Sequence, residues 1–417
     1  MSVQQQVTET ARAARQAARS LAAIDARQRA AALRAMAQAL RDNAAEIIEA
    51  NAVDMQAGEK SGLISAMLDR LLLNEDRIED IAVGLEEIAD LPDPVGHVIK
   101  EWKIENGLKI QRVSTPIGVI GIIYESRPNV TADAAGLCIK SGNACVLRGG
   151  SESINSNLAI AKVLQQAAEA EGLPAGAISM IPITDREAVG IMCRSPEYID
   201  LIVPRGGEGL IRAVSENAQV PVLKHYRGMT QIYVDEAADL DLAVKLVHNA
   251  KVQRPGVCNA VENLYVHTEA VDVLQAIVED LQAADVEIRG CSRTVALAEG
   301  ITPAGDEDFD TEYLDLILSV MIVDSLDDAL EQIALYTSGL TEAIITEDQE
   351  TAERFLREVD SAAVYHNAST RLTDGGVFGL GAEIGVSTDR IHARGPVGAA
   401  ELTIYKYVCR GDGQIRT

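Results

Sequence analysis

The chain has 417 residues, more than one hydrophobic core usually supports, so two or more domains are expected. Its 47% apolar and 24% charged residues are typical of an ordinary globular protein. The 63 acidic residues outnumber the 37 basic ones and give a formal net charge of -26. This excess argues against nucleic acid and anionic membranes as partners, because both require a basic face, but a small anionic substrate stays compatible with it.

Neither the cysteines nor the histidines follow a metal-binding pattern. No Cys-x-x-Cys pair occurs, the six histidines show no ligand spacing, and we expect no metal. The N-terminus lacks the apolar core of a signal peptide, and no apolar run approaches the ~18 residues of a membrane span. Free thiols are normal in a reducing compartment, so a cytoplasmic protein is expected. The cysteines are Cys138, Cys145, Cys193, Cys258, Cys291 and Cys409.

The chain begins with a helical region and continues into a β-hairpin. Residues 1–90 carry apolar side chains at helical spacing, for example Leu33, Met36 and Leu40. Residues 97–115 alternate between apolar and polar around Glu105-Asn106-Gly107, which predicts a hairpin. Such a hairpin needs a partner strand, and another subunit is one source of it.

From Ile117 onward, apolar strand-like runs alternate with helical segments. "IGVIGIIY" and "NACVLRGG" are continuous enough for strands buried on both faces. Thr184 and Glu187 in "TDRE" predict a capping box at a helix start. The alternation predicts a doubly wound parallel α/β sheet. The expected elements are a helix over 153–171, strands in "AISMIP" and "YIDLIVPRGG", and a helix after the latter.

A second α/β set begins near residue 224. Helices are expected over 239–250 and 270–284, with a strand over 261–267 between them. Residues 365–400 are rich in glycine, and a long segment of this kind usually lines a site or wraps a neighbour. The terminal "ELTIYKYVC" alternates like a strand that can pair with the hairpin near 105.

Cys258 is the cysteine with the most reactive sequence setting. Most cysteines are small buried hydrophobes, but Cys258 follows the sharp turn of Pro255 and Gly256 and precedes Asn259. A thiol at a turn, with backbone N–H groups beside it, can act as a nucleophile whose oxyanion those groups stabilise.

Asn129 and two glycine-rich strand exits also stand at positions suited to chemistry. Asn129 in "ESRPNVTAD" either caps the following helix or offers its amide to a substrate oxygen, and the sequence leaves both open. Arg148 in "VLRGGSE" and Arg205 in "IVPRGGEG" accompany glycines that let a phosphate approach the backbone. Neither segment has the Gly-x-Gly-x-x-Gly dinucleotide fingerprint.

Four segments together resemble the gamma-glutamyl phosphate reductases, or glutamate-5-semialdehyde dehydrogenases, of the aldehyde dehydrogenase superfamily. They are "YESRPNVTADAAGLCIKSGNACVLRGGSE", "LIVPRGGEGLI", "VQRPGVCNAVENL" and "VDSAAVYHNASTRLTDGGVFGLGAEIGVSTDRIHARGPVG". The resemblance runs from "AMLDRLLL" to the C-terminus. It implies reduction of L-glutamyl 5-phosphate by NADPH to L-glutamate 5-semialdehyde and phosphate, the second step of proline biosynthesis, through a thioacyl-cysteine.

The resemblance also assigns roles to residues and segments. Catalysis falls on Cys258 and on the oxyanion amide of Asn129. It implies a cofactor-binding domain over 1–96 and 117–223 with part of 361–399, a cysteine domain over 224–360, and an oligomerisation element over 97–116 and 400–417. We expect cofactor contacts from Arg148, Gly149, Ser151, Glu152, Arg205, Gly206, Gly207 and Glu312, and substrate contacts from Arg127, Thr370, Arg371 and Arg394.

Three residues depart from the family pattern, and one departure from hydrolytic relatives suits the chemistry. Many members have Cys-His at Thr230-Gln231 and a His at Leu340. Hydrolytic aldehyde dehydrogenases carry a general-base Glu in the region that reads "VLKHYRGMTQIYVDE" here, and no Glu fills that slot. Because phosphate rather than water attacks the thioester in the reverse direction, an activated water would waste the intermediate.

Two alternative functions stay open at this stage. A coenzyme A-acylating aldehyde dehydrogenase shares the cysteine and the missing base. A non-catalytic regulatory paralogue is supported only by Thr230, Gln231 and Leu340. A homo-oligomer is expected, and a transient glutamate 5-kinase partner would protect the unstable acyl phosphate.

Overall fold

A computed structural model describes residues 1–416, which divide into two compact units. Unit 1 contains Met1–Lys224, Gly379–Gly385 and the residues from Ile391 onward. Unit 2 contains His225–Phe378 and Val386–Arg390. Among residues 1–416, no helix is both long enough and apolar enough to cross a membrane.

The core of unit 1 is a parallel sheet of four strands in the order β5-β4-β3-β6. From β3 the chain adds β4 and then β5 on one side of the sheet. It then crosses back and adds β6 on the other side of β3, so the strand order reverses between β3 and β6. In such a sheet, ligands bind at the carboxyl ends of the strands at this point. The strands are β3 (Val119–Tyr124), β4 (Ala144–Gly149), β5 (Ile178–Met180) and β6 (Leu201–Arg205).

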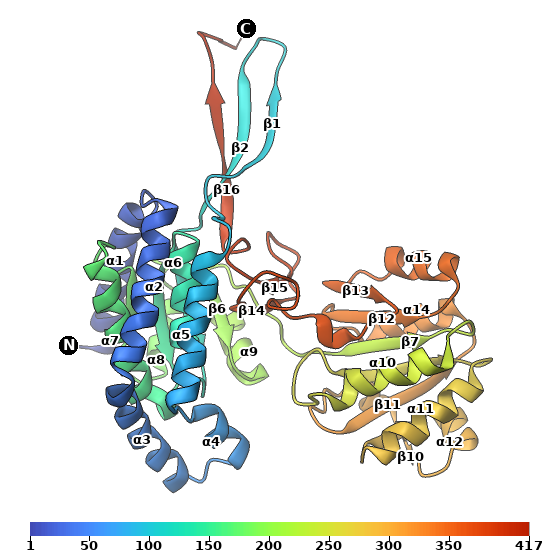
Figure 1. The fold of residues 1–417 in the computed structure, drawn as a ribbon. Coiled ribbons are helices and arrows are strands. Elements are labelled where there is room, and N and C mark those ends of the chain that lie inside the picture. The colour runs from blue at the N-terminus through green and yellow to red at the C-terminus, as the bar shows by residue number, and fades with distance from the viewer. Residues whose placement is uncertain (417) are drawn as a thin grey trace. The chain divides into compact units, whose positions relative to one another are not determined.

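Helices cover both faces of this sheet (Figure 1). Helices α2, α5, α6 and α7 share one apolar core with the sheet, and α1, α8 and α9 share another. Five helices precede the first strand. They fall in residues 1–90, for which the apolar spacing predicts helical structure. The helices are α1 (Val3–Leu21), α2 (Ala26–Asp42), α3 (Ala44–Lys60), α4 (Ser65–Leu71), α5 (Glu75–Asp90), α6 (Val130–Lys140), α7 (Ile154–Ala170), α8 (Glu187–Cys193) and α9 (Glu208–Asn217), with the short η1 (Ser151–Ser153) before α7.

The predicted capping box at Thr184 is wrong. Helix α8 begins only at Glu187, after Arg186, and no side chain caps it at the N-cap position. The side chain of Asp185 accepts the Glu187 N–H instead, at 2.8 Å. The motif fails because the helix starts two residues later than the box requires.

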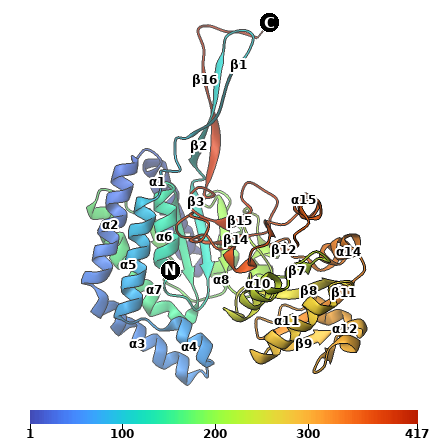
Figure 2. The same cartoon turned by 45° about the vertical axis from the view of Figure 1, so that its right-hand side comes forward.

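Unit 2 is built on a parallel sheet of seven strands in the order β10-β9-β11-β8-β7-β12-β13. Helices α10 and α11 pack in one core on this sheet, and α14 and α15 pack in another (Figure 2). The strands are β7 (Thr230–Val234), β8 (Val261–His267), β9 (Glu287–Gly290), β10 (Thr302–Pro303), β11 (Ile317–Val323), β12 (Thr341–Ile345) and β13 (Ala363–His366). The helices are α10 (Leu240–Val252), α11 (Val271–Ala283), α12 (Ser292–Leu297), α13 (Asp306–Phe309), α14 (Leu326–Tyr336), α15 (Gln349–Glu358) and the short η2 (Thr370–Leu372).

The glycine-rich segment carries little regular structure. It holds the short strands β14 (Gly385–Ser387) and β15 (Gly395–Val397), which pair with each other. Unit 2 retains the segment up to Phe378, and most of the residues beyond it belong to unit 1.

The hairpin and the terminal strand form a separate antiparallel sheet in unit 1. β1 (Val98–Lys103) pairs with β2 (Lys109–Pro116), and β2 pairs along its whole length with β16 (Thr403–Arg410). Both views show this sheet extending away from the helices of unit 1 (Figures 1 and 2). The pairing of the terminal strand with the hairpin is as its alternation predicts.

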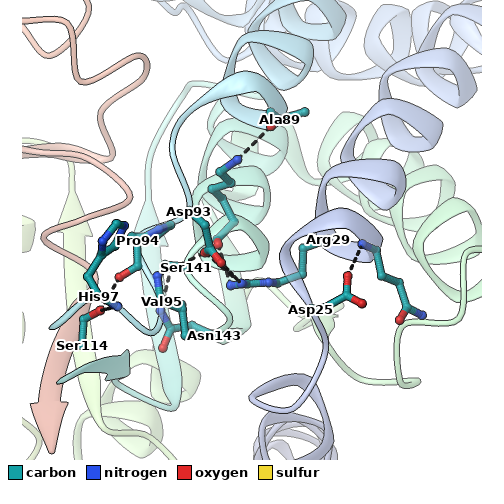
Figure 3. A network of polar contacts seen from close by, with 12 residues as sticks. Asp25, Arg29, Ala89, Asp93, Pro94, Val95, His97, Ser114, Ser141 and Asn143 are labelled. Carbon is teal, nitrogen blue, oxygen red and sulfur yellow. Dashed lines mark hydrogen bonds and ion pairs between the residues drawn. The ribbon is translucent and has the colours of Figure 1, made fainter.

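A polar network ties the base of this sheet to the helices (Figure 3). The buried guanidinium of Arg29, on α2, donates to the Lys140 carbonyl at 2.8 Å and to both oxygens of Asp93 at 2.8 and 3.0 Å. Asp93 lies in the segment that leads into β1. Beside it, the Ser114 hydroxyl, on β2, donates to the Pro94 carbonyl at 2.7 Å. The network therefore fixes the direction in which the hairpin leaves unit 1.

Candidate active site

Cys258 lies in unit 2, in the loop of residues 253–260 that joins α10 to β8. Its thiol is partly exposed, whereas Cys138, Cys145 and Cys193 are buried. A turn in which the Ala260 N–H donates to the Val257 carbonyl at 3.0 Å surrounds it. The loop therefore presents the thiol at the amino end of β8.

The segment after β13 holds this loop through Asn259, the next residue after the cysteine. The Asn259 amide donates to the Thr373 carbonyl at 2.8 Å, and its own backbone carbonyl accepts the Thr370 hydroxyl at 2.9 Å. Arg371 donates to the Asn259 side-chain oxygen and, through Nε at 2.8 Å, to Gln253. The structure thus brings Thr370 and Arg371 to the cysteine loop.

These contacts alter the expectation for Thr370. Its side chain is fully buried and its hydroxyl is used within the loop, so the structure gives it a role in holding Cys258 in place rather than as a donor to substrate. Arg371 is partly buried, and burial is the largest effect lowering the pKa of its guanidinium, followed by the nearby charge of Arg254.

A second segment, 228–230, touches the cysteine directly. A side-chain carbon placed on Gly228 would lie 2.3 Å from the Cys258 carbonyl oxygen and 2.5 Å from its Cβ, so this position has room for glycine alone. The Thr230 hydroxyl donates to the same carbonyl at 2.9 Å. Gly228 and Thr230 thus stand in the region where hydrolytic relatives carry a base.

Glu312 is connected to the cysteine through Gly228. Its Oε1 accepts the Gly228 N–H at 2.8 Å. The carboxylate that the resemblance assigns to the cofactor therefore bonds to Gly228, the residue that packs against Cys258.

The departures from the family pattern occupy buried positions. Gln231 is buried and accepts the Tyr265 hydroxyl at 2.7 Å, and Leu340 lies in the apolar core. Both residues are therefore accommodated in the interior of unit 2.

In unit 1, the carboxyl ends of β3, β4 and β6 meet through two carboxylates. Glu125, after β3, accepts the Gly207 N–H at 3.1 Å. Glu152, after β4, accepts the Ser126 N–H at 2.6 Å and its hydroxyl at 2.7 Å. These bonds join the strand exits at the point where the sheet changes direction, where the candidate cofactor residues Gly149, Ser151, Glu152, Arg205, Gly206 and Gly207 are gathered.

Asn129 begins α6 in unit 1, but it does not cap the helix. No side-chain cap bond is made, and the amide Nδ2 donates instead to Asp133 Oδ2 at 2.8 Å. Burial raises the pKa of Asp133 to about 6 against the opposing effect of the Asn129 bond. Because an amide has two N–H donors, Asp133 orients the group and leaves the second hydrogen for another acceptor.

Arg148 is more enclosed than its expected role suggests. Its side chain is 7% exposed, and Nη2 donates to the Thr184 carbonyl at 2.7 Å and to the Asp185 carbonyl at 3.3 Å. Burial is the main cause that lowers the pKa of its guanidinium. Arg148 therefore also holds the start of α8 against β4.

Two further candidate substrate cations, Arg127 and Arg394, lie in unit 1. Arg127 is exposed in the loop that also carries Asn129, and Arg394 is partly buried in the glycine-rich segment. The structure does not gather these two with Arg371 in one unit.

Sequence reasoning missed several residues that shape the site. Gly228 and Asp133 have no local motif, and their importance follows only from the fold. Lys251 and Glu262 stand on either side of the cysteine loop in "AKVQRPGVCNAVEN", and two opposite charges so placed were a visible sign of an ion pair. The residues missed are Glu125, Asp133, Gly228, Lys251 and Glu262.

The family model described as "Aldehyde dehydrogenase family" matches residues 1–290. The chain belongs to the aldehyde dehydrogenase family. A gamma-glutamyl phosphate reductase from Syntrophomonas wolfei is 53% identical over 100% of this chain and 99% of that protein. One from Moorella thermoacetica is 54% identical over the full length of both.

A solved structure extends this likeness to the fold. The crystal structure of a gamma-glutamyl phosphate reductase from Thermotoga maritima has 46% identity and a TM-score of 0.97, and the match covers 99% of this chain and 100% of that one. Within the aldehyde dehydrogenase family, the chain therefore belongs with the gamma-glutamyl phosphate reductases, and the expected family and fold class are confirmed.

Proposed function

We propose that the chain reduces L-glutamyl 5-phosphate to L-glutamate 5-semialdehyde and phosphate, the second step of proline biosynthesis. One observation carries the proposal: a partly exposed cysteine on a clamped loop with Gly228, not a carboxylate, against it. Full-length identity of 53% to gamma-glutamyl phosphate reductases supports the same substrate.

In this mechanism the Cys258 thiolate attacks the acyl phosphate carbonyl. The oxyanion is stabilised by the Cys258 N–H and by the amide of Asn129, each good donor contributing roughly 3–4 kcal/mol. The C–O bond to phosphate then breaks and leaves a thioester on Cys258. Since no carboxylate stands in the segment 228–230 to activate water, the thioester is spared from hydrolysis.

The reducing cofactor is a nicotinamide dinucleotide, for which the glycine exits of unit 1 are suited. When bound, it supplies the hydride that converts the thioester to a thiohemiacetal, which releases the aldehyde and regenerates the thiolate. Glu312 would hold the nicotinamide ribose of the bound cofactor, and Arg148 would favour NADPH by contacting its 2′-phosphate. Arg371, Arg127 and Arg394 are the candidates for the substrate carboxylate, with Arg371 first because it bonds to Asn259 of the cysteine loop.

The coenzyme A-acylating reaction and the non-catalytic paralogue are the rivals. A proline auxotroph that lacks this step should grow without proline when it expresses the chain. Purified protein should oxidise the semialdehyde with phosphate and not with coenzyme A. Growth failure with a folded, expressed chain, or dependence on coenzyme A, contradicts the proposal.

Substitution of the cysteine tests the mechanism itself. Cys258→Ala should abolish the reaction in both directions while the protein stays folded, and Cys258→Ser should be nearly as inactive because no base activates its hydroxyl. Cys291→Ala, at another partly exposed thiol, is the matched control and should retain activity. Activity above a few per cent in folded Cys258→Ala would remove the nucleophile assignment.

A further inference from the structure

A buried ion pair lies at the base of the loop that carries Cys258. The side chains of Lys251 and Glu262 are both 0% exposed, and their Nζ and Oε2 atoms are 2.8 Å apart. Lys251 is in the last turn of α10 and Glu262 is in β8, on either side of loop 253–260. Removing two charges from water is costly, and apolar residues of similar size often fill such a space equally well. The pair therefore calls for a role beyond filling the core.

Lys251 closes the loop. Besides Glu262, its ammonium donates to the Val261 carbonyl at 3.0 Å. One cation in the helix before the loop is thus bonded to two successive residues of the strand after it. These bonds fix the separation of the two ends between which Cys258 is presented.

Glu262 connects the same base to a second segment. Its Oε1 accepts the Leu314 N–H at 3.2 Å. Leu314 has a φ of 54°, in the left-handed region that residues other than glycine rarely adopt. Two residues earlier, Glu312 accepts the N–H of Gly228, the glycine that packs on Cys258. Glu262 therefore links the cysteine loop to the segment that presents Glu312.

We infer that Lys251 and Glu262 are positioning residues for the reaction: Lys251 fixes the Cys258 loop, and Glu262 fixes segment 312–314. This inference rests on the proposed function, in which Cys258 is the nucleophile and Glu312 holds the cofactor ribose.

Single substitutions would mix the loss of a contact with the stranding of a charge. Burial raises the pKa of Glu262 to about 7 and lowers the pKa of Lys251, and each partner opposes the shift of the other. The test therefore removes both charges at once in two matched variants. Lys251→Met/Glu262→Gln keeps a carbonyl oxygen that can accept the Leu314 N–H, whereas Lys251→Met/Glu262→Leu does not.

Two measurements separate the two parts of the inference. The rate at which iodoacetamide alkylates Cys258, followed by mass spectrometry of its peptide, reports the loop and needs no substrate. The KM for NADPH, compared with kcat, reports the segment of Glu312. Both variants should change the alkylation rate at least about threefold, because both lose the bond to Val261. The Leu variant alone should raise the KM for NADPH, by about tenfold, as expected for the loss of one anchoring hydrogen bond.

A purely structural role predicts that the two folded variants behave alike. An unchanged alkylation rate in both overturns the role of Lys251, and equal KM values in the two overturn the role of Glu262. If near-UV circular dichroism shows that the Leu variant is unfolded, amide exchange at Leu314 in the Gln variant replaces the KM comparison, and loss of wild-type protection there contradicts the anchor. A wild-type chain without reductase activity would refute the proposed function, while the alkylation rates would still decide the positioning of Cys258.

Discussion

At the scale of single residues, the site depends on what lies against Cys258. Gly228 leaves no room for a side-chain carbon, since one would meet the backbone of Cys258 at 2.3 Å. These backbone atoms cannot move aside, as the end of a flexible side chain could. A substitution at Gly228 must therefore displace the cysteine or its own segment.

We predict that Gly228→Ala lowers kcat by about 100-fold or more with a small change in stability, because a displacement near 1 Å in a reacting group costs that much. Gly256→Ala, in the cysteine loop 253–260, is the matched control, because an added carbon there would meet only the Leu314 carbonyl at 3.7 Å. Steady-state kinetics and a thermal melt on both variants check this. Equal losses in the two, or full activity in Gly228→Ala, would contradict the steric argument.

Arg148 combines a structural bond with its proposed cofactor role. Arg148→Ala should raise the KM for NADPH at least about tenfold more than that for NADH, because only NADPH has the 2′-phosphate that a guanidinium contacts through two bonds. Arg148→Lys keeps the charge and should lie between wild type and Ala. Loss of the bond to the Thr184 carbonyl affects both cofactors alike, so equal effects on both would leave only that structural role.

At the scale of elements, the sequence predicted what depends on local pattern. The run "IGVIGIIY" became β3, and the predicted strand over 261–267 matches β8 residue for residue. The box at Thr184 failed because a competing acceptor, Asp185, lies closer to the helix start. Lys251 and Glu262 were not predicted, since their pairing arises only when the loop between them folds back.

The network at the base of the three-stranded sheet gives a test of how elements are joined. Arg29→Met should destabilise unit 1 by about 2 kcal/mol, because the partly exposed Asp93 carboxylate and the buried Lys140 carbonyl lose their donor. Arg34→Met, on the same helix, removes an ion pair with Asp90 whose side chains are 53% and 71% exposed, and should cost under about 1 kcal/mol. Urea unfolding of both variants measures the difference. Similar midpoints would mean that the network adds no stability.

At the scale of the whole molecule, the three-stranded sheet is a feature whose apolar residues its own unit leaves exposed. Ile404, Tyr405 and Tyr407 on β16 are 38%, 42% and 57% exposed, and Val98 and Ile99 on β1 are 50% and 49% exposed. β1 and β16 are the outer strands, so their outer edges carry backbone groups available for pairing. The net charge of -26 keeps such molecules apart unless a specific contact forms.

We predict a homodimer, or a larger assembly of dimers, that uses residues 97–116 and 400–409. Deletion of 401–417 removes β16, exposes the inner strand β2, and should give monomer or aggregate with a secondary loss of activity. Deletion of 412–417 is the matched control, because β16 ends at Arg410 and keeps its full pairing. Light scattering with an activity assay reads both variants. A 401–417 deletion that stays dimeric and active would show that the sheet serves the single chain and that the interface lies elsewhere.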